Sequence, residues 1–379
     1  MSARPGALAH RRGAVLVLAA AALLAGAAVA IATLHGVPER DRGHPSPRTA
    51  ARAAAGRFLQ RYVDADGRVV RRDQGGDTVS EGQAYAMLLA VATGDRRRFA
   101  TVWRWTRRHL QRPDGLLSWH WAGGHVADPE PAADGDLDAA RALLLAGRRF
   151  GRRDYRRAGL RIGRGILAHE TTTAGGRLVL VAGPWARDRR VVDPSYHSPR
   201  AVAALRRASG DRRWDRLARS GLDIARALQG HRSGLPPDWA VVGATDVTPI
   251  GTPQDPGAQA RYGFDAVRLP VRMAESCSRA DRRQAAAAWR SLRAASRGAL
   301  PAVLDLGATP LQRFEHPAAL AGAAGAAIAA GDRRAALRLL GRAAALDARA
   351  PTYYGAAWVA LGRVMLTTDL LGRCRRGHA

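Results

Sequence analysis

One stretch of the sequence places a glutamate in the first turn of a predicted helix. Residues 77–89 read DTVSEGQAYAMLL, so Thr78 or Ser80 can cap a helix and Glu81 falls just inside it. The helix dipole favours a glutamate there, and capping is its simplest role. Gly82 argues for more than capping, because glycine weakens a helix and suits places where another group approaches the backbone closely. Glu81 is thus a candidate for proton transfer.

A second stretch carries three acids at alternate positions before an apolar helix. Residues 132–146 read AADGDLDAARALLLA, with Asp134, Asp136 and Asp138 in the acidic part. One aspartate would suffice as a cap, and three that converge would repel one another and raise the pKa of at least one. An EF-hand is excluded, because the Asp-x-Asp-Gly order and the distal glutamate are missing.

A third stretch places an aspartate where a loop enters a helix. Residues 261–270 read RYGFDAVRLP, with Asp265 three residues before Arg268. A local salt bridge is the simplest explanation of this pair. None of the three stretches specifies a reaction by itself.

Together, the three stretches resemble glycoside hydrolase family eight, which contains inverting endoglucanases and bacterial cellulases linked to cellulose synthesis. The resemblance spans most of residues 51–372, and the order and spacing of the stretches fit. The acidic signature of the family matches Ala132 to Phe150, with departures at Ala133 and Ala139. The resemblance implies an (α/α)6 barrel.

The resemblance also implies roles for the acids. Glu81 would be the general acid, Asp265 the general base, and Asp134 a carboxylate that holds the sugar at the point of cleavage. Inversion needs one protonated carboxyl and one ionised carboxylate, about 6.5–9.5 Å apart, with a water on the far face of the sugar. Arg268 is expected to keep Asp265 ionised. Phe264 stands where better-known relatives have a tyrosine, which removes a hydroxyl from the catalytic subsite.

Aromatic side chains are the second expected part of a sugar-binding site, because sugar rings have apolar faces. The substrate-binding candidates on loops and helix starts are Trp119, Trp185, Tyr196, Arg268, Tyr354 and Asp136. Tryptophans at helical spacing are expected in the core instead, namely Trp103, Trp105, Trp214, Trp289 and Trp358. No histidines pair at ligand spacing, so neither a metal nor a cofactor is expected.

The elements that carry these residues are predicted to be helical, because Ala, Leu and Arg dominate while Tyr, Phe and Ile are sparse. A phrase of Gly or Asp followed by arginines recurs at 94–97, 151–155, 210–214, 280–283 and 331–334. Glycine ends a helix and aspartate caps the next, so each copy predicts a tight helix-to-helix turn. About six helix pairs fit between residues 51 and 372, which predicts an all-α (α/α)6 barrel or, alternatively, an open helical solenoid.

Composition limits the possible partners. The apolar fraction of 47% and charged fraction of 24% exclude fibrous and disordered classes. All 60 basic residues are arginine against 32 acids, for a net charge of +28. The arginines are dispersed without interleaved aromatics, so no nucleic-acid partner is expected. A monomer with solvated helix faces is expected, with anionic cell-surface polymers or phospholipid as secondary, salt-sensitive partners.

The N-terminal region predicts export. Residues 13–34 are an apolar run that follows Arg11 and Arg12 and is long enough to cross a bilayer. Residues 1–36 are therefore expected to be a signal peptide or, preferably, an uncleaved anchor that places the rest of the chain outside, in a bacterium if the family resemblance holds. Residues 37–50 are a linker, 51–372 the catalytic domain and 373–379 a basic tail.

The two cysteines, Cys277 and Cys374, allow at most one intramolecular disulfide. The simpler expectation is a buried, unpaired Cys277 and a free Cys374 in the basic tail.

Two functions follow from these observations. The first is hydrolysis of internal β-1,4-glucosidic bonds in a cellulose-like polysaccharide, with xylan, mixed-linkage glucan and chitosan as other family substrates. Chitosan ranks last, because a basic protein repels a polycation. The alternative is a non-catalytic barrel that binds an exopolysaccharide and guides its secretion.

Overall fold

Helices make up most of the described part of the chain, which covers residues 45–374 of the computed structural model. The expected signal or anchor segment lies outside the described residues, as do most of the linker and the end of the basic tail. Within residues 45–374, no helix combines the length and apolar character needed to cross a bilayer.

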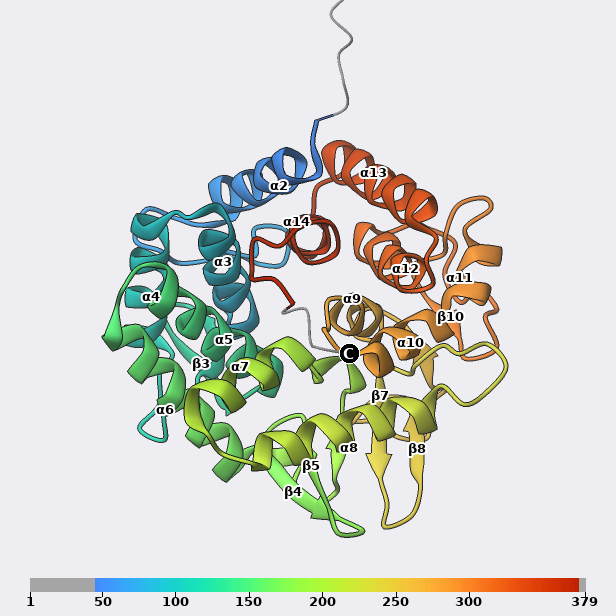
Figure 1. Ribbon diagram of the computed structural model, residues 1–379, viewed down its shortest axis with the longest axis horizontal. Coiled ribbons are helices and arrows are strands. Elements are labelled where there is room, and N and C mark those ends of the chain that lie inside the picture. The colour runs from blue at the N-terminus through green and yellow to red at the C-terminus, as the bar shows by residue number, and fades with distance from the viewer. Residues whose placement is uncertain (1–44, 375–379) are drawn as a thin grey trace, which may run out of the picture. The chain divides into compact units, whose positions relative to one another are not determined.

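Six helices in the described part form a closed inner ring (Figure 1). They are α3 (Ser80–Thr93), α5 (Ala133–Arg149), α7 (Pro199–Ser209), α9 (Arg268–Ala274), α12 (Pro317–Ala329) and α14 (Tyr353–Thr367). Each contacts the next in this order, and α14 contacts α3. This closure excludes the open solenoid and agrees with an (α/α)6 barrel.

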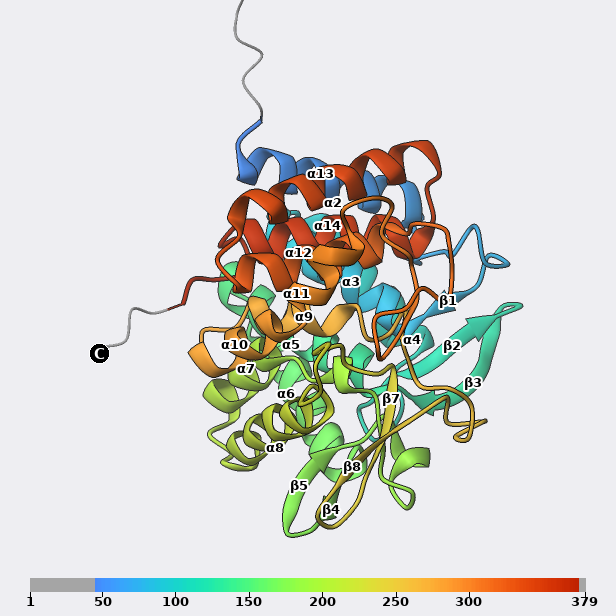
Figure 2. The ribbon, with the colours of Figure 1, turned by 90° about the vertical axis from the view of Figure 1, so that its right-hand side faces the viewer.

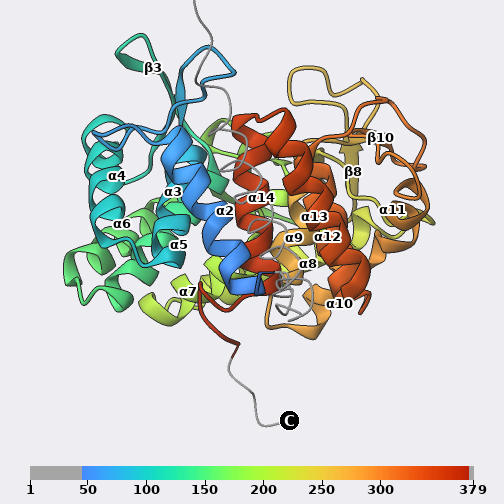
Figure 3. The same ribbon diagram turned by 90° about the horizontal axis from the view of Figure 1, so that it is seen from above.

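An outer layer pairs one helix with each inner helix (Figure 1). It consists of α2 (Pro47–Tyr62), α4 (Arg96–His109), α6 (Arg153–His169), α8 (Arg213–Leu228), α10 (Arg279–Ala287) and α13 (Arg333–Arg349), with α11 (Trp289–Ala295) following α10. The first and last helices also meet, because α2 packs on α14 (Figure 3).

The inner helices pack closely because small and apolar residues cover most of their surface. In α3 and α12 nearly every residue is buried. Gly325 of α12 lies against α9 so tightly that a Cβ there would come within 2.7 Å of the backbone nitrogen of Val271. One large hydrophobic cluster follows the ring, and the five tryptophans expected in the core are all buried.

Short turns link inner to outer helices as the recurring phrase predicts, with one exception. Gly94 ends α3 in the left-handed conformation, and Asp95 caps α4 by accepting from the backbone of Arg98. The same arrangement recurs where Asp332 caps α13. The phrase at 280–283 was wrongly read as a turn: it lies inside the first turns of α10, whose cap is Ser278.

Long loops link outer to inner helices, and they contain the short strands that an all-α prediction missed. The structure pairs β1 (Thr78–Val79) with β2 (Ser118–Ala122) and β3 (His125–Pro131), and β4 (Thr171–Ala174) with β5 (Arg177–Leu180). It also pairs β6 (Val191–Val192), β7 (Trp239–Val242) and β8 (Val247–Ile250), and β9 (Arg261–Tyr262) with β10 (Leu304–Asp305). All pairings are antiparallel. Two 3₁₀ turns, η1 (Pro184–Ala186) and η2 (Pro194–Tyr196), complete these loops.

The barrel therefore has two different ends, which Figure 2 shows from the side. The strand-bearing loops gather at one end, here called the open end. The tight turns between inner and outer helices lie at the other, here called the short-turn end, where the described chain also stops.

A disulfide ties the end of α9 to the end of the chain. Cys277 and Cys374 are bonded, with their Cα atoms 5.4 Å apart, and residues 45–374 contain no free cysteine. The expectation of two unpaired cysteines was therefore wrong. The C-terminal segment is also held by Arg200, whose Nη2 donates to the carbonyl of Gly372 at 2.6 Å.

Candidate active site

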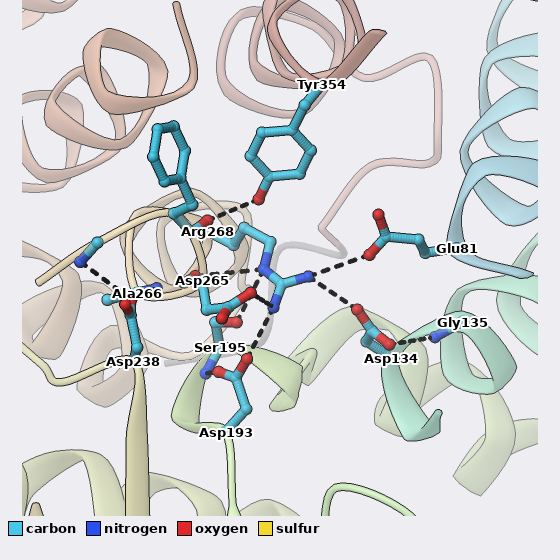
Figure 4. Close-up of polar contacts among 12 residues, drawn as sticks. Glu81, Asp134, Gly135, Asp193, Ser195, Asp238, Asp265, Ala266, Arg268 and Tyr354 are labelled. Carbon is cyan, nitrogen blue, oxygen red and sulfur yellow. Dashed lines mark hydrogen bonds and ion pairs between the residues drawn. The ribbon is translucent and has the colours of Figure 1, made fainter. Parts of the chain in front are cut away.

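Arg268, the first residue of α9, is the cation around which the acidic side chains gather at the open end (Figure 4). Its Nη1 lies 3.4 Å from Oε2 of Glu81 and 2.8 Å from Oδ2 of Asp134. Its Nη2 lies 2.7 Å from Oδ2 of Asp193 and 2.8 Å from Oδ1 of Asp265. The three acidic stretches of the sequence thus meet at one guanidinium, together with a fourth carboxylate.

Glu81 and Asp265 approach this guanidinium from opposite sides (Figure 4). Because they contact its two terminal nitrogens, which belong to one planar fork, their oxygens lie no more than roughly 9 Å apart. Both reach solvent, with 23% and 35% of the side chain exposed, whereas Arg268 and Asp134 are 2% exposed. The two acids therefore face solvent, while the charged groups that they contact, Arg268 and Asp134, are buried.

Two glycines let the helices approach closely enough to place Glu81. A Cβ at Gly82 would lie 2.5 Å from the hydroxyl of Tyr353, so the absence of a side chain admits that ring. A Cβ at Gly135 would lie 2.5 Å from Oγ of Ser80 and 3.1 Å from the backbone nitrogen of Glu81. The close approach inferred from Gly82 is thus real, and Gly135 brings Asp134 beside Glu81.

Asp265 is positioned by the loop that precedes α9. Oδ1 of Asp238 accepts hydrogen bonds from the backbone nitrogens of Gly263 and Ala266, at 2.9 and 2.8 Å. The hydroxyl of Tyr354 donates to the carbonyl of Phe264 at 2.7 Å. These bonds hold the backbone on both sides of Asp265.

Burial separates the proton affinities of the two exposed acids. Desolvation, followed by the charge of Asp134, raises the pKa of Glu81 to about 8. Desolvation also raises the pKa of Asp265 to about 6, while the Arg268 guanidinium opposes this rise. Near pH 7, Glu81 is mostly protonated and Asp265 is mostly ionised. These are the protonation states that a general acid and a general base need.

Comparison with known proteins identifies the family. A family model described as glycosyl hydrolases family 8 matches residues 46–368. The chain belongs to family 8.

Relatives in family 8 agree with this assignment. The chain is 35% identical to a probable endoglucanase of Novacetimonas hansenii over 222 residues, which cover 56% of this chain and 64% of the relative. It is 32% identical to an endoglucanase of Cellulomonas uda over 232 residues, covering 59% and 64%. The matches thus span less than two thirds of these relatives.

Solved structures agree over a longer part of the chain. The endo-beta-1,4-glucanase CMCax from Acetobacter xylinum superposes with a TM-score of 0.71 at 28% identity, over 84% of this chain and 98% of that one. A beta-1,3-1,4-glucanase from Paenibacillus sp. X4 shares the fold, with a TM-score of 0.76 at 21% identity.

The aromatic candidates of this family 8 chain lie on several loops of the open end. Trp119 in β2 stacks on His120, with ring centroids 4.7 Å apart. Trp185 in η1 is 39% exposed, and its ring centroid lies 6.4 Å from that of Trp239. Tyr196 in η2 lies under the Arg268 guanidinium, 5.1 Å from its ring centroid. The half-buried Tyr354 is the second residue of α14 and lies next to Phe264.

Arg268 and Asp136, both assigned to substrate binding from the sequence, are buried, so neither reaches solvent. Oδ1 of Asp136 accepts from the backbone nitrogen of Leu117 at 3.0 Å, and the buried Glu170 carboxyl is its neighbour. Burial raises the pKa of both carboxyls well above their usual range, and the charge of Asp136 raises that of Glu170 further. The structure gives Asp136 the role of holding the segment that leads into β2 and Trp119.

Sequence reasoning missed three polar residues of the site. Asp193 contacts Arg268, and Oγ of Ser195 accepts from Nε of Arg268 at 2.9 Å. The Asp-Pro pair at 193–194 is a helix-start signal beside Tyr196 and could have pointed to them. The third missed residue is Asp238, which holds the loop around Asp265, and no local sequence pattern points to it. Within residues 45–374, no cluster of three or more His, Cys, Asp or Glu side chains could hold a metal ion.

Proposed function

We propose that this family 8 protein is an inverting, endo-acting hydrolase of β-1,4-glucosidic bonds in a cellulose-like polysaccharide. The observation that carries the proposal is the pair of solvent-facing acids, Glu81 and Asp265, on opposite sides of one buried arginine. The relatives named as endoglucanases support the substrate class.

Glu81 is the general acid of the proposed reaction. Its raised pKa keeps the proton on the carboxyl near pH 7, and its exposed edge can deliver that proton to the glycosidic oxygen. Cleavage leaves Glu81 as a carboxylate, which the nearby Arg268 guanidinium stabilises.

Asp265 is the general base. It takes a proton from a water that attacks the anomeric carbon from the face opposite the leaving group, so the product is an α-anomer. The Arg268 guanidinium favours its ionised form. Asp134, which is 2% exposed and lies 2.8 Å from the Arg268 guanidinium, would hold the sugar at the point of cleavage.

The aromatic rings supply the binding surface. The exposed Trp185 and the partly exposed Trp119 and Tyr354 come from two different loops and from the first turn of α14, as stacking along an extended glucan chain would require.

Proton NMR of early products from a cello-oligosaccharide tests the mechanism. An α-anomer at first turnover, followed by mutarotation, is expected. A β-anomer at first turnover would contradict inversion and the role given to Asp265.

The viscosity of carboxymethylcellulose tests the proposal against the non-catalytic binder. An endo-acting enzyme lowers viscosity early, because each internal cut halves a long chain on average. A binder leaves viscosity unchanged. The different pKa values of Glu81 (about 8) and Asp265 (about 6) favour the enzyme, because they provide one protonated and one ionised acid near pH 7 and binding alone needs neither.

A further inference from the structure

The short-turn end of the barrel carries positive charge that the protein does not neutralise. Each inner-to-outer turn, taken together with the first turns of the helix that follows it, contains two or more arginines but few acids, and the acids are already engaged. Asp154 pairs with Arg152, and Asp211 pairs with Arg213, each at 2.7 Å. The pairs therefore leave the remaining turn arginines without a neutralising partner.

Those remaining arginines share three properties: they are exposed, they lie in the turns or first helical turns of this end, and no ion pair is recorded for them among residues 45–374. They are Arg97, Arg153, Arg212, Arg279, Arg283, Arg333 and Arg334. They come from all five inner-to-outer turns. The charge is therefore spread over the whole end.

A hollow at the same end concentrates more of this charge. It has a volume of about 600 Å³ and is lined by Arg148, Arg156, Arg200, Arg207 and Arg373, together with Cys277 and a few apolar atoms. No acidic side chain belongs to this lining. Burial lowers the pKa of the Arg200 guanidinium, and the charges of Arg141, Arg207 and Arg148 lower it further against the opposing effect of Glu275. Five arginines thus line the hollow, of which Arg373 is ion-paired with Asp369.

The open end has a different balance of charge, although exposed arginines such as Arg232, Arg297 and Arg313 form no ion pair there within residues 45–374 either. There Arg71 pairs with Asp77 at 2.5 Å, Arg112 with Asp114 at 3.0 Å, and Arg261 with Asp238 at 3.2 Å. Acids also outnumber arginines in its loops. A negatively charged surface would consequently attract the short-turn end and not the end that holds Glu81 and Asp265.

The described chain begins at the short-turn end as well. Arg48 in the first turn of α2 lies 2.9 Å from Asp369, close to the disulfide that ends the described chain. Only thirteen residues separate the apolar run at 13–34 from Arg48, and they span at most roughly 45 Å when extended. If that run lies in a bilayer, the attachment point is held near the bilayer surface.

We propose that the short-turn end is a docking surface for a bilayer that contains anionic phospholipid, with lipid phosphates bound by the turn arginines and by the arginine-lined hollow. Guanidinium groups suit this partner, because their planar fork binds phosphate oxygens in pairs. Docking in this orientation turns the open end away from the bilayer, toward polymers outside. The proposal does not depend on the hydrolytic activity.

Vesicle sedimentation tests the proposal. Residues 47–374 form one compact unit whose hydrophobic core begins at Ala51, so a chain of residues 45–379 suffices and excludes insertion by the apolar run. Phosphatidylcholine vesicles are compared with vesicles that contain phosphatidylglycerol as well. Binding to the anionic vesicles only, weaker at high salt, is expected.

A matched pair of variants locates the binding surface. The short-turn variant is R97A/R153A/R333A, and the control is R232A/R297A/R313A, which removes the same charge from exposed positions at the open end. Each arginine near an anionic surface changes partitioning by about fivefold, so the short-turn variant should lose on the order of 10²-fold while the control loses far less. Thermal unfolding by circular dichroism checks that both variants are folded.

A charge reversal in the hollow sharpens the test. R148E should weaken binding to anionic vesicles more than the exposed R297E. Equal loss in the two triple variants, or equal binding to neutral vesicles, would overturn the proposal. So would binding to soluble polyphosphate without binding to anionic vesicles, which would indicate a free anionic polymer as the partner instead.

Discussion

The two ends of the barrel use arginine in opposite ways. At the open end, Arg268 is buried and contacts four acidic side chains, so its charge holds these acids in place. At the short-turn end, residues such as Arg153 and Arg333 are exposed and unpaired within the described chain. The comparison teaches that burial and partners, rather than residue type, decide whether an arginine organises a site or presents charge to a partner.

The largest expected effect comes from the acid pair at the open end. Glu81→Gln keeps the shape of the side chain but cannot donate a proton as a carboxyl does, so kcat should fall on the order of 10³-fold or more. The measurement is turnover on a soluble β-glucan. Glu130→Gln, on the exposed part of β3, is the matched control and should change turnover little. Equal turnover in wild type and Glu81→Gln would remove Glu81 from the mechanism.

The next effect contrasts buried with exposed arginines directly. Arg268→Ala leaves four carboxylates without their shared cation, which should cost about 3–5 kcal/mol of unfolding free energy. Arg153→Ala at the short-turn end should stay within about 0.5 kcal/mol of wild type. Urea denaturation followed by circular dichroism measures both. Similar losses in the two variants would break the comparison.

A third prediction separates stability from chemistry. Cys277→Ser with Cys374→Ser opens a link across a sequence separation of 97, worth up to about 4 kcal/mol if it acts by restricting the unfolded chain. Turnover at 25 °C should be unchanged within twofold, because the contacts of Glu81 and Asp265 do not include this link. A large loss of turnover in a folded double variant would show that the disulfide also positions α9.

The smallest effect concerns pH. Activity requires ionised Asp265 and protonated Glu81, whose pKa values are raised to about 6 and about 8. Turnover should therefore fall below about pH 6, as the base gains a proton, and above about pH 8, as the acid loses one, with an optimum between them. Initial rates in overlapping buffers measure this profile. An optimum at pH 4–5, where unperturbed carboxyls titrate, would contradict the effect of burial on this pair.

Much of the helical frame could be predicted from local signals. The turns at 94–97 and 331–334 formed as predicted, because glycine and aspartate determine caps within a few residues. The phrase at 280–283 failed, because Ser278 caps the helix earlier and the aspartate falls inside. Strands such as β6 could not be predicted, since their pairing partners lie in distant loops, as when β6 pairs with β7. The hairpins β2–β3 and β4–β5 turn at paired glycines, a local signal that the prediction of an all-α fold passed over.

The residues of the site also fall into two groups, those that local sequence could predict and those that it could not. Glu81, Asp134 and Asp265 stand in patterned stretches, so their chemistry was visible in the sequence. The partnership of Asp136 with Glu170, and of Asp193 with Arg268, arises only when separate hairpins pack together. The disulfide is a similar case, because a Cα separation of 5.4 Å depends on where the chain end returns.

The glycines that admit Tyr353 and Asp134 limit how this barrel can be engineered. Replacing a helical glycine by alanine commonly adds about 0.4–1 kcal/mol of stability when space allows. Gly56 in α2 and Gly341 in α13 have nothing within 4 Å of an added Cβ and are good targets for thermostabilisation. Gly82 and Gly135 are not, since a methyl group at either would push α3 away from its neighbours and displace the acid that α3 carries.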